Sequence, residues 1–226
     1  GIVPGVMYDL SKKHILESVD GILKRLDMEY LDALVLHRPD ALVEPEEVAA
    51  AFDELEKSGK VRHFGVSNQK PMQIELLKRY VKQPIEIDQL QLSIPCSNMI
   101  TNGMEVNMAS EGAVDRDGSV LDYCRLNDIT IQAWSPFQYG FFEGVFIGNE
   151  EKYPKLNAVL NELADKYNVS PSGIATAWIL RHPAGIQMIA GSTSRKHMQE
   201  IIDGSHVTLT KEEWYRLYLA GDHMLP

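Results

Sequence analysis

Residues able to form hydrogen bonds or transfer a proton follow the apolar runs of this sequence. "LDALVL" (31–36) runs directly into His37, and "VRHFGVS" (61–67) ends at Ser67, which Asn68 follows. An imidazole can exchange a proton near neutral pH, whereas hydroxyl and amide groups offer uncharged hydrogen bonds. Three further positions have a similar placement: Gln89 in "IEIDQLQL" (85–92), Trp134 at the end of "ITIQAW" (129–134), and Ser135 directly after it.

A small-residue segment, "AGSTSRKH", follows the last apolar run and leads into a predicted helix over 194–203. Free backbone N–H groups and the helix dipole at such a turn favour a bound phosphate. The segment supplies Gly191, Ser192 and Thr193, and then Arg195 and His197. A phosphorylated heteroaromatic cofactor could use all of these groups: the imidazole, the amides, the flat indole and the predicted anion-binding segment.

Short apolar strands alternate with amphipathic helices along nearly the whole chain, which predicts parallel β/α units in an α/β fold. No linker or repeat divides residues 1–226, so we expect a single domain. The predicted strands are 31–36, 61–67, 85–92, 129–134 and 186–190. The predicted helices are 11–26, with Ser11 as N-cap, 44–60, 71–81, 120–128, 153–168, 170–182, 194–203 and 210–220.

Two connections are unusually long, 93–119 and 135–152, and both follow the C-terminal end of a predicted strand. Long loops in compact domains are commonly functional, and α/β barrels build their active sites at these strand ends. The second loop is rich in aromatic residues that could form a substrate-binding wall or could equally pack the loop onto the fold. These residues are Phe137, Tyr139, Phe141 and Phe142.

Composition excludes several classes of function. A formal net charge of -10 argues against non-specific nucleic-acid binding. No apolar run reaches the length of a membrane span, and the first residues do not resemble a secretory signal. Two cysteines without CxxC spacing, Cys96 and Cys124, favour inert thiols and a cytoplasmic location. His14, His63, His182, His206 and His223 show no metal-ligand spacing, so no metal is expected.

The ordered motifs "LDALVLHRPD", "GKVRHFGVSN", "IDQLQLS", "QAWSP" and "IAGST" resemble the aldo-keto reductase family over essentially the whole chain. The similarity is greatest to bacterial members whose chains end in an "EWYRLY"-like helix. The resemblance implies a (β/α)8 TIM barrel and an NADP(H)-dependent oxidoreductase that reduces an aldehyde or ketone to an alcohol. A small-molecule carbonyl substrate follows, with no nucleic-acid or membrane partner, and the oligomeric state stays open.

The resemblance also implies a role for each candidate residue. His37 would polarise the substrate carbonyl as a catalytic residue. Ser67, Asn68 and Gln89 would bind the nicotinamide carboxamide, and Trp134 would stack on the ring. The remaining residues would contact the phosphates: Ser135, Gly191, Ser192 and Thr193 along the pyrophosphate and adenosine, and Arg195 or His197 at the 2′-phosphate. Because His197 stands where the family usually has arginine, Arg195 and Lys196 on the same helical turn could supply the positive charge instead, and NAD remains possible beside NADP.

The sequence departs from the family in extent. A barrel of this type has eight strands in roughly 250 residues, and five strands are predicted here. We therefore expect the three N-terminal β/α units to lie outside this chain, together with the family's catalytic Asp, Tyr and Lys. Tyr8 is a poor substitute, so residues 1–226 alone are expected to be inactive. Two alternatives are a non-catalytic, cofactor-binding or interaction module and another TIM-barrel enzyme such as an isomerase.

Overall fold

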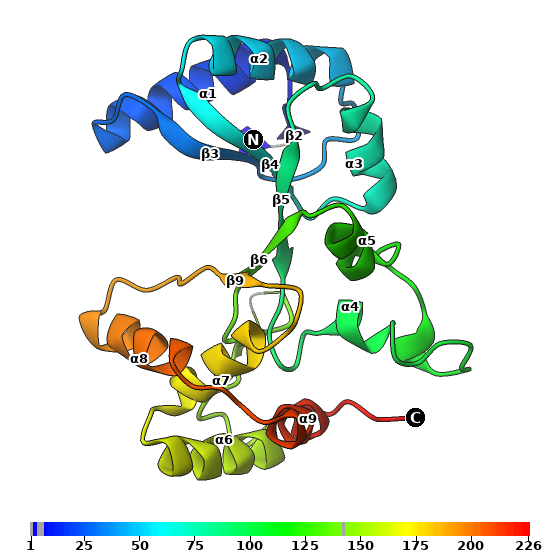
Figure 1. Cartoon of the computed structure of the whole chain (residues 1–226), viewed down its shortest axis with the longest axis vertical. Coiled ribbons are helices and arrows are strands. Elements are labelled where there is room, and N and C mark those ends of the chain that lie inside the picture. The colour runs from blue at the N-terminus through cyan, green and yellow to red at the C-terminus, as the bar shows by residue number, and fades with distance from the viewer. Residues whose placement is uncertain (1, 4–6, 142) are drawn as a thin grey trace. The chain divides into compact units, whose positions relative to one another are not determined.

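The computed structural model describes residues 2–3, 7–141 and 143–226 (Figure 1). The chain divides into two compact units, one formed by residues 1–89 and 122–130 and the other by residues 90–121 and 131–226. Each unit is described by itself, and the expectation of a single domain stays a prediction. No helix among the described residues is long and apolar enough to span a membrane.

The first unit is a parallel sheet with helices against it. β3 pairs with β4, and β4 pairs with β5, all in parallel. Its helices and strands are β1 (Ile2–Val3), β2 (Met7–Tyr8), α1 (Lys12–Leu26), β3 (Leu31–Leu36), α2 (Pro45–Lys57), β4 (Val61–Ser67), α3 (Pro71–Lys78), β5 (Ile85–Gln91), which continues into the second unit, and most of α5 (Val120–Leu126).

The helices of the first unit follow from local sequence signals. The Ser11 side chain accepts a hydrogen bond from the backbone N–H of His14, as an N-cap does, which confirms the predicted start of α1. α2 and α3 each begin with proline at the first turn, where its missing N–H costs nothing. α1 and α2 lie side by side (Figure 1), and Phe52 of α2 stacks on Phe64 of β4 at 4.2 Å between ring centroids.

The second unit contains mainly helices, with β6 and β9 paired in parallel. α7 packs closely on α8, and α6 packs on α7 and α9. Its elements are α4 (Asn98–Thr101), a 3-10 turn (Glu111–Ala113), β6 (Thr130–Trp134), β7 (Gln138–Tyr139), β8 (Gly144–Val145), α6 (Pro154–Tyr167), α7 (Pro171–Leu180), β9 (Gln187–Met188), α8 (Arg195–Ser205) and α9 (Lys211–Ala220).

The element order agrees with the sequence prediction, with differences at element ends and in the loops. The last strand is wrong in length: residues 186–190 were expected, but only Gln187 and Met188 pair with β6, followed by one N–H bond from Ile189 to Ala133. Gln187 and Ile189 are exposed. Burial of these side chains therefore does not stabilise a longer strand. The pattern also misses the short elements inside both long loops, because two to four residues carry no periodicity.

Glu213 ties α9 to α6 and gives the fold a testable pH dependence. Its carboxylate accepts hydrogen bonds from Lys166 Nζ at 2.5 Å, Tyr167 Oη at 2.8 Å and the N–H of Thr210 at 2.8 Å. Burial raises the pKa of Glu213, but these bonds outweigh it and lower the pKa from 4.5 to about 2. Because the folded-state pKa is depressed, the stabilisation is present above pH 4.5 and is lost as the pH falls toward 2.

We therefore expect Glu213→Gln to lower the free energy of unfolding by about 2 kcal/mol at pH 7. In urea titrations this difference shrinks as the pH falls from 4.5 toward 2. Glu162→Gln is the control, because Glu162 forms an exposed pair with Arg216 and its loss is expected to matter much less. A difference at Glu213 that is unchanged at pH 2.5 would show that ionisation is not its cause.

Candidate active site

Three neighbouring strands in the first unit carry candidate residues: His37 directly follows β3, Ser67 ends β4, and Gln89 lies near the end of β5. Ser67 pairs directly with Gln89 in the β4–β5 register. Leu36 pairs with Val66 in the β3–β4 register, so the next residue, His37, stands beside Ser67. Paired residues of parallel strands about 4.8 Å apart project to the same face. His37, Ser67 and Gln89 therefore form a row across one face of the sheet, at the strand ends where the sequence analysis expects them.

Hydrogen bonds hold part of this row in place. Ser67 Oγ donates to the carbonyl of Gln89 at 2.9 Å, and Asn68 Nδ2 donates to Ser67 Oγ at 2.6 Å. The N–H of Asn68 donates to the same Gln89 carbonyl at 3.0 Å. Asn68 adopts a left-handed conformation with φ 56°, which asparagine tolerates better than most residues. Ser67 and Asn68 thus form one polar cluster with the backbone carbonyl of Gln89.

His37 differs from the cluster because its side chain is exposed. It lines a cavity of about 360 Å³ between α1 and the end of β3, together with Leu10 and His14. Within the described residues the His37 ring forms no hydrogen bond, so both ring nitrogens are available to a ligand.

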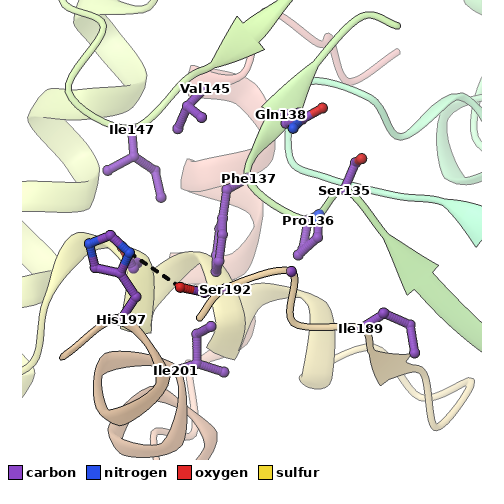
Figure 2. Close-up of a pocket in the computed structure, with 12 residues that line it drawn as sticks. Ser135, Pro136, Phe137, Gln138, Val145, Ile147, Ile189, Ser192, His197 and Ile201 are labelled. Atoms are coloured by element: carbon purple, nitrogen blue, oxygen red, sulfur yellow. Dashed lines mark hydrogen bonds between the residues drawn. The ribbon is translucent and has the colours of Figure 1, made fainter. Parts of the chain in front are cut away.

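A second cavity, of about 450 Å³, lies wholly within the second unit (Figure 2). This volume is in the ordinary range for a small-molecule site. Four predicted cofactor residues meet there: Ser135, Gly191, Ser192 and His197. The other lining residues are mostly apolar: Pro136, Phe137, Gln138, Val145, Ile147, Ser172, Ile189 and Ile201.

The start of α8 forms one side of this cavity. Ser194 is the N-cap and accepts the N–H of His197 at 3.5 Å, while Ser192 Oγ accepts the N–H of Ser194 at 3.1 Å. His197 Nδ1 and Ser192 Oγ face each other at 3.5 Å (Figure 2). Thr193 and Arg195 are exposed and do not line the cavity. The helix N-terminus, with cationic residues in its first turn, is a suitable environment for an anion.

Ser135 and Trp134 connect β6 to this cavity. Ser135 has φ 51°, and its carbonyl accepts the N–H of Gln138 at 3.1 Å, so the chain turns sharply here. Trp134 is half-buried, and its carbonyl accepts the N–H of Leu92 at 3.3 Å. The predicted stacking role of the indole stays a prediction.

The loop aromatics serve different purposes. Tyr139 packs on Tyr153 with ring centroids 5.2 Å apart, and the Lys152 ammonium lies 3.9 Å from the Tyr139 ring centroid. Phe137 lines the second cavity, whereas Phe141 is 65% exposed. Phe142 lies outside the described residues. The loop therefore uses one aromatic for packing and offers another as a cavity wall.

Several residues of these sites escape sequence reasoning. Ile201 follows His197 by one helical turn, so the i, i+4 spacing on α8 is a signal that could have found it. Ser172 and Ile189 carry no comparable signal. Asp88 is buried within β5, on the face opposite Gln89, where alternation leads one to expect an apolar residue.

The two cysteines are free thiols, one buried and one half-buried. Cys124 is fully buried, and burial together with the nearby Asp88 raises the pKa of its thiol to about 12. The half-buried Cys96 accepts the N–H of Gly140 at Sγ, 3.2 Å away. Across the described part of the chain, no group of three or more His, Cys, Asp or Glu residues is arranged to hold a metal.

Parallel β/α units with polar residues at the strand ends define the class of α/β enzymes whose sites lie at those ends. The family model described as "Aldo/keto reductase family" matches residues 2–218, and the chain belongs to this family. It is 35% identical over 215 residues to an "Uncharacterized oxidoreductase YcsN" of Bacillus subtilis, covering 94% of this chain and 65% of that protein. A "6-dehydroglucose reductase" of Agrobacterium fabrum is 30% identical, with 93% and 64% covered.

Solved structures agree on the fold. The thermostable aldo-keto reductase Tm1743, solved with the inhibitor epalrestat, superposes with a TM-score of 0.72 at 26% identity, covering 93% of this chain and 67% of that one. The Bombyx mori aldo-keto reductase AKR2E4, solved with NADP, has a TM-score of 0.70 at 20% identity, covering 95% of this chain and 65% of that one. The chain spans about 65% of the length of the curated relatives that it matches.

Proposed function

We propose that this chain carries the cofactor-binding part of an NADP(H)-dependent carbonyl reductase. The observation that carries the proposal is the row of His37, Ser67 and Gln89 across three adjacent strands, at or near their C-terminal ends. A family match across residues 2–218 supports the same assignment, and the two bacterial relatives described above support its bacterial branch.

Each unit, taken by itself, has residues that suit one part of a phosphorylated dinucleotide. The Ser67–Asn68–Gln89 cluster offers uncharged hydrogen-bonding groups of the kind that a carboxamide needs. Apolar walls and the N-terminus of α8 in the second cavity suit an adenosine phosphate, with Gly191 and Ser192 lining the cavity and the exposed Thr193 next to them in the chain. When bound, NADPH supplies a hydride for reduction of an aldehyde or ketone.

Within this reaction each group of the chain has a defined task. His37 donates a hydrogen bond to the carbonyl oxygen and stabilises the negative charge that develops there. Trp134 offers an indole face to the nicotinamide, and Ser135 contacts the pyrophosphate. Arg195 and His197 complement the 2′-phosphate, which makes NADP the proposed cofactor over NAD.

The general acid is proposed to be supplied from outside residues 1–226, in β/α units that complete an eight-stranded barrel around the five parallel strands seen here. Tyr8 is exposed on the short β2 strand, and the family-type Asp and Lys neighbours are not predicted beside it. Tyr218 is fully buried, and its hydroxyl pairs with Thr101 Oγ1 at 2.9 Å. Burial raises the pKa of Tyr218 and so disfavours its ionised form.

Cofactor choice provides the test of this function. Arg195→Ala is expected to weaken NADPH binding about tenfold and NADH binding less than about twofold, because only NADPH presents the 2′-phosphate. Binding is followed by quenching of tryptophan fluorescence, with Trp134→Phe identifying the contribution of that indole. Lys211→Ala, at an exposed position in the first turn of α9, controls for the general loss of one positive charge. The absence of NADPH binding to the wild-type chain would refute the proposal.

A further inference from the structure

A polar cavity of the second unit has no task in the proposed function. Its volume is about 620 Å³, and it lies where the loop around α4 meets the segment that follows α9 (Figure 1). Its walls come from the loop between Asn98 and Arg116 and from Asp222, His223 and Met224. It shares no lining residue with the cavity beside α8. Most of its side chains are polar or charged, so the cavity suits a polar ligand.

The carboxylate of Glu105 is the buried charge of this cavity. Glu105 is 3% exposed, and its Oε2 accepts a hydrogen bond from Ser110 Oγ. Within the described residues Oε1 has no hydrogen-bond partner and Glu105 forms no ion pair. Oε1 is not among the unpartnered polar atoms that are closed off from solvent, and Glu105 lines the cavity, so this oxygen opens into it.

Gly112 lies directly against this carboxylate. A Cβ at Gly112 would be 2.6 Å from the carboxyl carbon of Glu105. The absence of a side chain at Gly112 therefore leaves the space in which the carboxylate sits. Any larger residue there would push Glu105 away from its place in the cavity wall.

The lining of the cavity carries more negative than positive charge. Glu105, Glu111 and Asp222 contribute carboxylates, and Arg116 contributes a guanidinium group. Arg116 is already bonded, because it pairs with the carboxylate of Glu111 and donates to the carbonyls of Glu111 at 3.2 Å and Val114 at 3.4 Å. The charge of Glu105 thus has only the hydroxyl of Ser110 to compensate it, and burying a charge without a cationic partner is expensive.

His223 adds a second acceptor to the cavity wall. Its Nε2 lies 2.7 Å from the carbonyl oxygen of Ile94 and 3.0 Å from Ser97 Oγ. Because a carbonyl oxygen only accepts, Nε2 carries the proton and donates to it. Burial lowers the pKa of His223, so the ring is neutral at pH 7 and its Nδ1 is an acceptor. A ligand that complements these groups must therefore donate hydrogen bonds.

We propose that this cavity binds a small molecule through a protonated primary amine, whose ammonium group pairs with the Glu105 carboxylate. An ammonium group has three N–H donors and no acceptor, which matches the acceptors of the wall, and its charge compensates that of Glu105. A metal ion is a poorer match, since no group of three or more His, Cys, Asp or Glu residues in the described ranges is arranged to hold one. The inference does not depend on the proposed function.

The first measurement compares three probes on the wild-type chain by NMR, at one fixed concentration of sodium chloride. Ethanolamine carries the ammonium group, ethylene glycol replaces that group with a hydroxyl, and tetramethylammonium carries the charge without an N–H donor. We expect ethanolamine to cause saturable shifts of the Ser110, Gly112 and Met224 amides, and the other two probes to bind at least about tenfold more weakly. Shifts that do not saturate, or equal affinity for ethanolamine and either other probe, would refute an ammonium site.

The second measurement assigns the binding to Glu105. Glu105→Gln removes the charge and keeps the shape, so we expect it to bind ethanolamine at least about tenfold more weakly. Gly112→Ala, which displaces the carboxylate, should weaken binding as well. Glu151→Gln, at an exposed position outside the cavity, is the matched control for one lost negative charge and should change the affinity less than about twofold.

An affinity for ethanolamine that is unchanged in Glu105→Gln would overturn the proposal. Circular dichroism shows whether each variant is folded before its affinity is compared. If Glu105→Gln does not fold, the comparison of the three probes on the wild-type chain still decides, because it needs no variant.

Discussion

Replacing Gly204 with alanine is expected to unfold or severely destabilise the second unit, lowering the free energy of unfolding by about 3 kcal/mol or more. α7 and α8 pack backbone against backbone at Gly173 and Gly204. A Cβ at Gly204 would lie 2.2 Å from the carbonyl oxygen of Gly173 and 2.4 Å from its Cα. These are backbone atoms, so no side-chain rotation can relieve the overlap and the helices must separate.

Separation would also disturb the cofactor cavity, because α8 supplies His197 and Ile201 to its lining. Urea unfolding measures the stability, and NADPH quenching of fluorescence at a temperature where the variant is folded measures the cavity. Gly21→Ala is the matched control: it is also a helical glycine, but its Cβ would meet only the flexible end of Arg25. There we expect a stabilisation of about 1 kcal/mol from helix propensity. Equal, small effects at both positions would contradict the close helix contact.

Trp178→Ala is expected to cost about 4 kcal/mol of stability. Trp178 is 1% exposed and stacks on Trp214, with ring centroids 4.9 Å apart and an interplanar angle of 7°. The two residues also bond each other reciprocally. Nε1 of Trp178 donates to the carbonyl of Trp214 at 3.1 Å, and Nε1 of Trp214 donates to the carbonyl of Trp178 at 2.9 Å. Truncation therefore removes a stacked ring and leaves a buried carbonyl without its donor.

Trp178→Phe separates these two contributions, because it keeps an aromatic ring and removes the indole N–H. We expect about half of the alanine cost, measured by urea unfolding at pH 7. Leu126→Ala, which truncates an apolar side chain that is 83% exposed, should change the stability by less than about 0.5 kcal/mol. A Trp178→Ala variant as stable as the wild type would show that α7 and α9 do not depend on this ring pair.

The residues at the strand ends could be predicted because the apolar runs in the sequence show where each strand ends. An apolar run of six or seven residues makes a buried strand, and its last residue must emerge at the sheet edge. In this way the sequence places His37 and Ser67 at two successive strand ends; Gln89 lies inside the next strand, near its end, and the strand register brings the three into one row. The N-caps Ser11, Ser170 and Thr210 are local features of the same kind.

Other features depended on contacts between distant segments. The short pairing of β9 reflects how little of its surface is covered. The cavity beside α8 requires residues from β6, the following loop, α7 and α8 to meet, and no single period encodes that meeting. The sequence prediction ends the helix at residue 203, before Gly204, whereas α8 includes Gly204, and only the position of Gly173 explains why no larger residue fits there.

The sequence by itself determined the order of β/α units, the residues that end each strand, and the resemblance to the aldo-keto reductase family. The tertiary structure decided which of those residues share a cavity, and it revealed that the Asp88 carboxylate is buried within β5. The physical reason is that periodicity reports which face of an element is buried, whereas the partner that buries it lies far away in the chain. The effect of the buried Asp88 carboxylate and of Gly204 on the fold therefore depends on the distant residues that pack against them.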